Sequence, residues 1–321
     1  MINKGYFLQM GKATRLDLFP VGDLQYGVES FDKNLYRQFM EEYRESEADP
    51  RSVTASIGMG DYSDYFRPTN RGKIASMAGD DRDLLKGLDD VLEPHVRSVY
   101  HKIKDIFKPR TCLGLLEGHH YFRFSDGTTT TQRLCSMLGV PYLGISAFVV
   151  LHMKYRQYVW TQTLHSQHGE GGASSAASDL PKLERGTMPF FEADLYLRGH
   201  STKVYTAPFT RLGVMSPAKI SNSNSLTPGV LIGQPAAMKD IKGWMVNTGG
   251  FMRGYVDGDA EGSYVEKKRL APAPLGYARV EMHLKRMAPR DPEKRGPETR
   301  LFDVHYVQQR VTGVLGSAPI C

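Results

Sequence analysis

The segment Leu195-Tyr196-Leu197-Arg198-Gly199-His200 shows the pattern on which the chain is built: an apolar run that ends in glycine and histidine. Short apolar runs of this kind are typical of buried strands. Four earlier runs also end on Asp or His at or near a glycine, and they cover residues 16–23, 56–61, 112–120 and 158–168. Carboxylate oxygens and imidazole nitrogens bind divalent metals, so these strand ends predict a metal site at one edge of a sheet.

The composition indicates an ordinary globular protein. Of its 321 residues, 40% are hydrophobic and 24% are charged, as in a typical soluble domain. The excess of 41 Lys and Arg over 35 Asp and Glu, a net charge of +6, allows a polyanionic partner without requiring one. Three cysteines without CxxC spacing argue against a disulfide framework or a zinc ribbon.

No segment of the sequence has the features of a membrane span or a signal peptide. The longest apolar stretch, residues 143–153, is shorter than the about 20 residues that cross a bilayer. The N-terminus has only a brief apolar run, which is too short for a secretory signal. We therefore expect a cytoplasmic protein with no membrane partner.

Strands and helices alternate along most of the chain, which is typical of an α/β protein. Apolar positions at helical spacing predict helices over residues 29–45 and 81–107. The threonines at 128–131 provide an N-cap for a third helix, which should end at Gly139.

Other segments are predicted to be strands or loops. Residues 1–15 look like a polar lead-in, and residues 141–165 alternate as in a hairpin. The last third indicates antiparallel strands, with a basic hairpin loop at 286–300. No break in composition marks a second domain, so residues 1–321 are predicted to form one domain.

In order along the chain, the five strand ends resemble the five motifs of the calcineurin-like metallophosphoesterases. The segments are Asp23-Leu24-Gln25, Gly60-Asp61-Tyr62-Ser63-Asp64, Gly118-His119-His120, His168-Gly169 and Gly199-His200-Ser201-Thr202. The family pattern reads Asp-x-His, Gly-Asp, Gly-Asn-His followed by Glu or Asp, then His, and Gly-His-x-His. Residues 138–144 and 247–251 are similar to the phage and bacterial branch, and the resemblance covers about residues 16–285.

The resemblance implies an α/β fold of four layers, an αββα sandwich in which two mixed β-sheets are flanked by helices. It also implies a metal-dependent phosphoesterase that attacks a phosphate ester with metal-activated water. The basic balance and the phage-like segments favour nucleic acid, DNA or RNA, or a nucleotide as substrate. The expected activity is therefore that of a hydrolase such as a nuclease or phosphodiesterase, and no substrate-binding residues are assigned.

The same resemblance implies roles for the metal ligands. Asp23 would hold a first ion, and Asp61 would bridge two ions. Three histidines, His119, His168 and His200, would complete the coordination of the second ion.

Three further residues are candidates for the site. His120 matches the family's catalytic histidine, which protonates the leaving oxygen or stabilises the developing charge. His165 competes with His168 for the fourth motif, and His168 is preferred because Gly169 follows it. Asp64 is a nearby acid that could belong to the site, and the alternative is that it is a solvated surface residue.

The chain departs from the family pattern at three positions. Gln25 and Thr202 replace histidine ligands of the first site, whereas His119 replaces an asparagine of the second. An amide or hydroxyl binds a transition metal more weakly than imidazole does. We therefore expect one strong site and one weakened or vacant site, filled by one or two divalent ions. Mn²⁺ is the first expectation, with Zn²⁺, Fe²⁺ and Mg²⁺ as alternatives.

A different class of function stays open at this point. A degenerate member of the family would keep the fold and serve as a binding or scaffold protein. Gln25 and Thr202 are the residues that favour this alternative. In a separate, bland interpretation, Asp23 and Asp61 taken one at a time are helix N-caps, which are common after strands of α/β proteins.

Overall fold

The computed structural model describes residues 1–65, 82–170, 180–201, 203–215, 237–256, 266, 275–286 and 305–315. Its helices in these ranges are α1 (Lys33–Ala48), α3 (Arg82–Ile103), α4 (Thr130–Leu138) and α5 (Leu180–Gly186). Its strands are β1 (Ile2–Gln9), β2 (Arg15–Val21), β3 (Ser52–Gly58), β4 (Cys112–Leu116), β5 (Tyr142–Gly144), β6 (Ser146–Tyr155), β7 (Tyr158–Gln167), β8 (Leu195–Arg198), β9 (Val204–Met215), β10 (Ala237–Gly250), β11 (Gly276–Arg286) and β12 (His305–Leu315).

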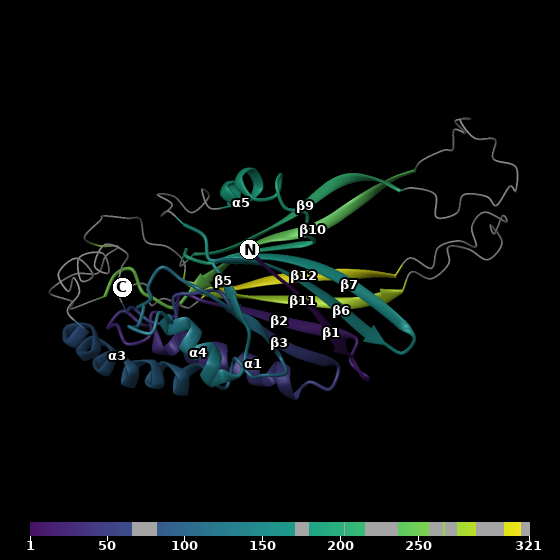
Figure 1. Cartoon of the computed structure of the whole chain (residues 1–321). Coiled ribbons are helices and arrows are strands. Elements are labelled where there is room, and N and C mark those ends of the chain that lie inside the picture. The colour runs from purple at the N-terminus through teal and green to yellow at the C-terminus, as the bar shows by residue number, and fades with distance from the viewer. Residues whose placement is uncertain are drawn as a thin grey trace, which may run out of the picture.

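These strands form one continuous mixed sheet of twelve strands (Figure 1). Its main path runs β1-β6-β7-β8-β10-β11-β2-β3-β4-β5, while β9 pairs with β10 and β12 pairs with β11. The strands β2, β3 and β4 are parallel, as are β7 and β8. The last third of the chain is antiparallel in its β9–β10 and β11–β12 pairs, as predicted.

The expected αββα sandwich of two separate sheets is wrong, because β10 connects β8 and β11 and makes the sheet continuous. Its residues Trp244 to Asn247 pair with β8, whereas Gly249 and Gly250 pair with β11. Gly249 has φ +79, and a Cβ atom there would lie 2.1 Å from the carbonyl oxygen of Gly276. Only glycine allows β10 to turn and approach β11 this closely, so the sheet continues through this point.

The helices do not form the two outer layers of such a sandwich either. Within the described ranges, α1, α3 and α4 gather on one side of the sheet, and the short α5 lies on the other (Figure 1). The helix α1 begins at the N-cap Asp32, whose side chain accepts hydrogen bonds from two backbone N–H groups. The helix α4 begins with a capping box at Thr129 and ends at Gly139 in the left-handed conformation, as predicted.

Two apolar clusters hold these layers together. One fills the space between α1, α3, α4 and the sheet, and Phe39, Tyr43 and Val99 are among its fully buried members. The other combines side chains of β2, β3 and β4 with those of β6, β7, β8 and β10. The sheet therefore folds back so that its two halves pack against each other. The halves bring the C-terminal ends of β2, β3 and β4 close to those of β7 and β8.

The predictions for residues 1–15, 141–165 and 286–300 can be compared with the structure one by one. Residues 1–15 are not a lead-in, because β1 pairs in parallel with β6 over its whole length. The predicted hairpin at 141–165 is confirmed in its main part, where β6 and β7 are antiparallel. The predicted basic loop at 286–300 lies outside the described residues, apart from Arg286 at the end of β11.

In the described part of the chain, no helix combines the length and apolarity that crossing a membrane requires.

Candidate metal centre

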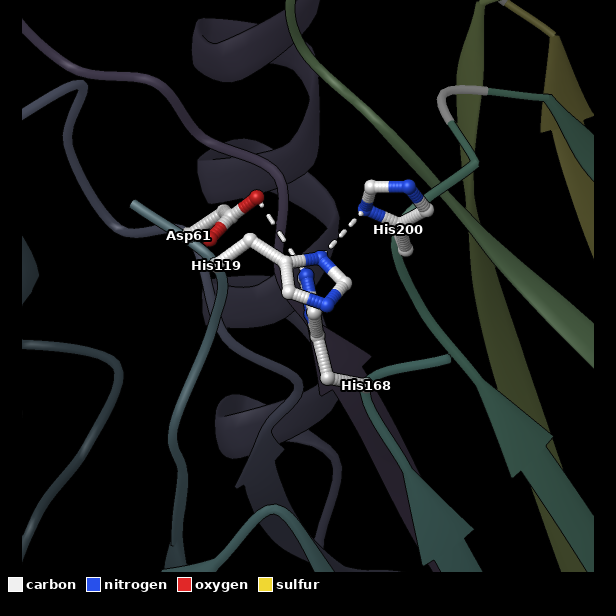
Figure 2. Close-up of side chains that lie close together, drawn as sticks. All are labelled: Asp61, His119, His168 and His200. Carbon is white, nitrogen blue, oxygen red and sulfur yellow. Dashed lines mark hydrogen bonds and ion pairs between the residues drawn. The ribbon is translucent and has the colours of Figure 1, made fainter. Parts of the chain in front are cut away.

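Four side chains from four loops converge where the strands end (Figure 2). They are Asp61 after β3, His119 after β4, His168 after β7 and His200 after β8. One ligand atom of each lies within 4.8 Å of those of the other three. Asp61 and His168 are buried, whereas His119 and His200 are partly exposed. The group therefore has a buried side and a side that solvent reaches.

Two glycines make room for Asp61 at the centre of the group. Gly60 has φ +97, and a Cβ atom there would lie 2.5 Å from Nδ1 of His168. A Cβ atom at Gly118 would lie 2.0 Å from Oδ1 of Asp61. The same oxygen accepts a hydrogen bond of 2.9 Å from the backbone N–H of His120. The glycines beside the predicted ligands are needed because the carboxylate and an imidazole occupy the space of their missing side chains.

His168 is oriented in the way that metal-binding histidines are. Its Nδ1 donates a hydrogen bond of 2.6 Å to the carbonyl oxygen of Met59, so Nε2 is the atom that faces the other ligands. Nε2 is buried and forms an ion pair of 3.3 Å with Oδ2 of Asp61. A backbone acceptor on the far nitrogen of a histidine commonly fixes the tautomer that a metal requires.

The charges of His168 and Asp61 depend on each other. Burial by itself would lower the pKa of His168, but the negative charge of Asp61 outweighs burial and raises that pKa to about 9. Burial would raise the pKa of Asp61, yet the charge and hydrogen bonding of His168 hold it below its usual range. Without a metal the pair is therefore an imidazolium and a carboxylate at neutral pH, and a cation would take the place of the proton.

The two partly exposed histidines offer neutral nitrogens. Nδ1 of His119 lies 3.0 Å from Nδ1 of His200. Burial lowers the pKa of His200 to about 4, with a further contribution from the charge of His168. Burial also lowers the pKa of His119. Both rings are uncharged at neutral pH, which is the state that binds a metal.

Asp23 and Gln25 lie beside this group and are not members of it. Asp23 is buried, and its Oδ2 accepts a hydrogen bond of 2.8 Å from the backbone N–H of His200. Burial raises the pKa of Asp23 to about 7, and the nearby charge of His168 opposes the rise. Gln25 donates a hydrogen bond of 3.3 Å from Nε2 to Oδ2 of Asp61. The expected first-site ligands therefore contact the group through its hydrogen bonds.

Backbone conformation sets these loops apart from the rest of the described chain. Five residues other than glycine have positive φ in that part of the chain, and four of them are Asp23, Gln25, Asp61 and His200. Left-handed backbone is unfavourable for such residues and tends to occur at functional sites. Four of the five strained residues therefore lie in loops that carry or adjoin the candidate ligands, and the fifth, Arg156, lies in the turn between β6 and β7.

His120 and Asp64 form a second pair at the rim of the group. Nδ1 of His120 contacts Oδ1 of Asp64 in a hydrogen-bonded ion pair. Both side chains are partly exposed. The carboxylate of Asp64 therefore fixes the orientation of the His120 ring.

Two other candidates from the sequence lie elsewhere or outside the described chain. His165 lies within β7, where its ring stacks on Phe191 with the centroids 4.7 Å apart. The strand β7 ends at Gln167, so His168 lies in the following loop and joins the cluster in its place. Thr202 lies outside the described residues.

One supporting residue, His95, could not be identified from the sequence. Ser63, in the loop of Asp61, donates a hydrogen bond of 2.5 Å to the carbonyl oxygen of Tyr26 and lies 2.7 Å from Nε2 of His95. His95 belongs to α3, and this contact ties the loop after β2 to the loop after β3 and to the helix. No local pattern marks His95, because its partners are distant in sequence.

The donor set suits a borderline divalent cation. Three imidazoles and one carboxylate are typical ligands of Zn²⁺, Fe²⁺ and Mn²⁺. Nε2 of His168 and Oδ2 of Asp61 lie 3.3 Å apart, and a cation that displaced the shared proton would bind both atoms. The group of Asp61, His119, His168 and His200 can therefore hold a metal ion.

Comparison with known proteins adds no family assignment. No family model matches the chain, and no curated protein matches its sequence significantly.

Proposed function

We propose that this protein is a metal-dependent hydrolase of phosphate esters, with Asp61, His119, His168 and His200 as the ligands of its ion. The observation that carries the proposal is the convergence of these four ligand atoms within 4.8 Å. When bound, a divalent ion, with Mn²⁺ as the first expectation, would act as a Lewis acid towards the ester and lower the pKa of a water molecule. The resemblance to the calcineurin-like metallophosphoesterases supports the same activity.

In this proposal His120, oriented by Asp64, transfers a proton to the leaving group of the ester. Asp64 contacts Nδ1 of His120 and orients the ring, and His120 would protonate the leaving oxygen of the ester. Proton transfer from a positioned histidine commonly contributes about 10²–10⁴-fold to a rate. Asp64 acts through His120 and is therefore a positioning residue.

We propose nucleic acid or a nucleotide as the substrate class, and a cytoplasmic location. The net charge of +6 supports a polyanionic substrate, because a basic surface attracts phosphate groups. An alternative function is suggested by Gln25 and Thr202, which stand in place of histidines. In that alternative the protein binds a metal without turnover and serves as a binding or scaffold protein.

The experiment compares two histidines that lie three residues apart. We expect His168→Phe to lose bound metal and hydrolysis of an aryl phosphodiester and of DNA in the presence of Mn²⁺. His165→Phe is the matched control, because His165 stacks on Phe191 outside the group, and it should keep both properties. Equal metal content and turnover in the two variants would contradict the proposal. Metal binding without turnover in the wild type would favour the binding or scaffold function.

A further inference from the structure

We infer that Gln25 limits the centre to a single ion. The inference rests on the proposed metal centre and concerns how many ions that centre accepts. A two-ion phosphoesterase needs a carboxylate that is shared between ions about 3.5–4 Å apart. Asp61 is the carboxylate of the group, so the surroundings of its two oxygens decide whether a second ion can bind.

Both oxygens of Asp61 already have partners. Oδ1 accepts the backbone N–H of His120 at 2.9 Å. Oδ2 faces Nε2 of His168 at 3.3 Å and also accepts Nε2 of Gln25 at 3.3 Å. The amide therefore donates a hydrogen to the oxygen that a second ion would have to share. A donor and a cation cannot occupy the same side of one oxygen.

Turning the amide of Gln25 over does not produce a good second site. Its Oε1 would then face Oδ2 of Asp61, and two acceptors repel unless a cation separates them. The remaining ligand of such a site would be Asp23, whose Oδ2 already accepts the backbone N–H of His200 at 2.8 Å. The result would be a site with a neutral amide oxygen and carboxylate oxygens that already accept other hydrogen bonds, which carries too little negative charge to bind a second cation tightly.

The backbone also keeps Gln25 in place. Its φ of +47 is left-handed, and its N–H donates a hydrogen bond of 3.1 Å to the carbonyl oxygen of Asp61. The side chain is buried, and its Oε1 has no hydrogen-bond partner.

Substitution at this one position tests the inference, with Mn²⁺ as the probe. Gln25→Glu has the shape of the natural side chain but replaces the donor by an oxygen ligand, and Gln25→His supplies an imidazole. Gln25→Met is the matched control, because it has a similar length and offers neither a donor nor a good Mn²⁺ ligand. Bound Mn²⁺ is counted by elemental analysis after equilibrium dialysis, and its paramagnetic resonance spectrum distinguishes an isolated ion from an exchange-coupled pair.

We expect one isolated Mn²⁺ per chain in the wild type and in Gln25→Met, and a coupled pair in Gln25→Glu or Gln25→His. Circular dichroism identifies which of the variants are folded, and only those are compared. A coupled pair in the wild type would overturn the inference and leave the proposed function standing. A single ion in both Gln25→Glu and Gln25→His, when both are folded, would also overturn the inference. No bound Mn²⁺ in the wild type would overturn the proposed function and this inference together.

Discussion

His119 and His200 place their Nδ1 atoms 3.0 Å apart, although they follow strands β4 and β8, which are not neighbours in the sheet. The contact exists because the sheet folds back and its two halves share an apolar cluster. Two neutral imidazoles at this distance can share one proton, and a cation can take the place of that proton. The fold thus concentrates nitrogen ligands that the order of the strands alone would keep apart.

The affinity for metal should rise with pH until about pH 9. His168 carries a proton below its pKa of about 9, and an incoming cation must displace that proton. Each unit of pH below that value should weaken the apparent affinity by up to about tenfold. Calorimetric titration with Mn²⁺ between about pH 6.5 and about pH 8.5 measures this slope and the proton released. An affinity that is constant over this range would contradict the assigned state of His168.

Gly118→Ala should weaken metal binding by about 10- to 100-fold, because a strained contact typically costs about 1–3 kcal/mol. The new methyl group would lie 2.0 Å from Oδ1 of Asp61, so the carboxylate must move. Gly87→Ala in α3 is the control, since nothing lies within 4 Å of a Cβ atom there. It should leave metal binding unchanged and stabilise the helix by up to about 1 kcal/mol. Similar Mn²⁺ affinities in the two variants would show that Asp61 is not a ligand.

Asp64→Asn should reduce kcat by about 10- to 100-fold while the metal content stays at the wild-type level. The amide cannot stabilise a charged His120 as the carboxylate does, so the pH dependence of kcat should shift towards acid. Asp90→Asn is the control, because Asp90 is an exposed residue of α3. Steady-state kinetics with an aryl phosphodiester and metal analysis of the same samples provide the readouts. Loss of metal in Asp64→Asn would assign Asp64 to the metal site instead.

His165→Phe should make the protein more resistant to acid. Both ring nitrogens of His165 are buried without hydrogen-bond partners, and burial lowers the pKa of this residue to about 4. The unfolded chain takes up the proton near pH 6.5, so the stability that depends on neutral His165 is present above about pH 6.5 and is lost as pH falls towards 4. Urea unfolding at several pH values should show a loss that is smaller in the variant by about 1–2 kcal/mol. Parallel curves for the two proteins would contradict this account of His165.

The residues of the candidate site were predictable because the signal is local. Asp61, His119, His168 and His200 each follow an apolar strand and adjoin a glycine, and the close contacts at Gly60 and Gly118 explain those glycines. Parallel neighbours bring the ends of β3 and β4 together, and likewise those of β7 and β8, but the two pairs meet only because the sheet folds back on itself. The choice between His165 and His168 depended on where β7 ends, which a periodic pattern does not fix to within a residue.

The arrangement of the sheet depends on contacts between distant residues and could not be predicted in the same way. The pairing of Gly249 and Gly250 with β11 makes one continuous sheet where two were expected. A glycine pair in a strand indicates a bend or a close approach, but it does not identify the partner. Similarly, β1 pairs Ile2 with Ala147, and the mostly exposed residues of this edge strand look like a polar terminus.

X-ray diffraction from crystals grown with Mn²⁺, recorded at the manganese absorption edge, tests the central claim most directly. We predict one anomalous peak among Asp61, His119, His168 and His200, about 2.0–2.3 Å from one atom of each side chain. A fully soaked crystal with no peak among these four side chains would contradict the proposed metal centre.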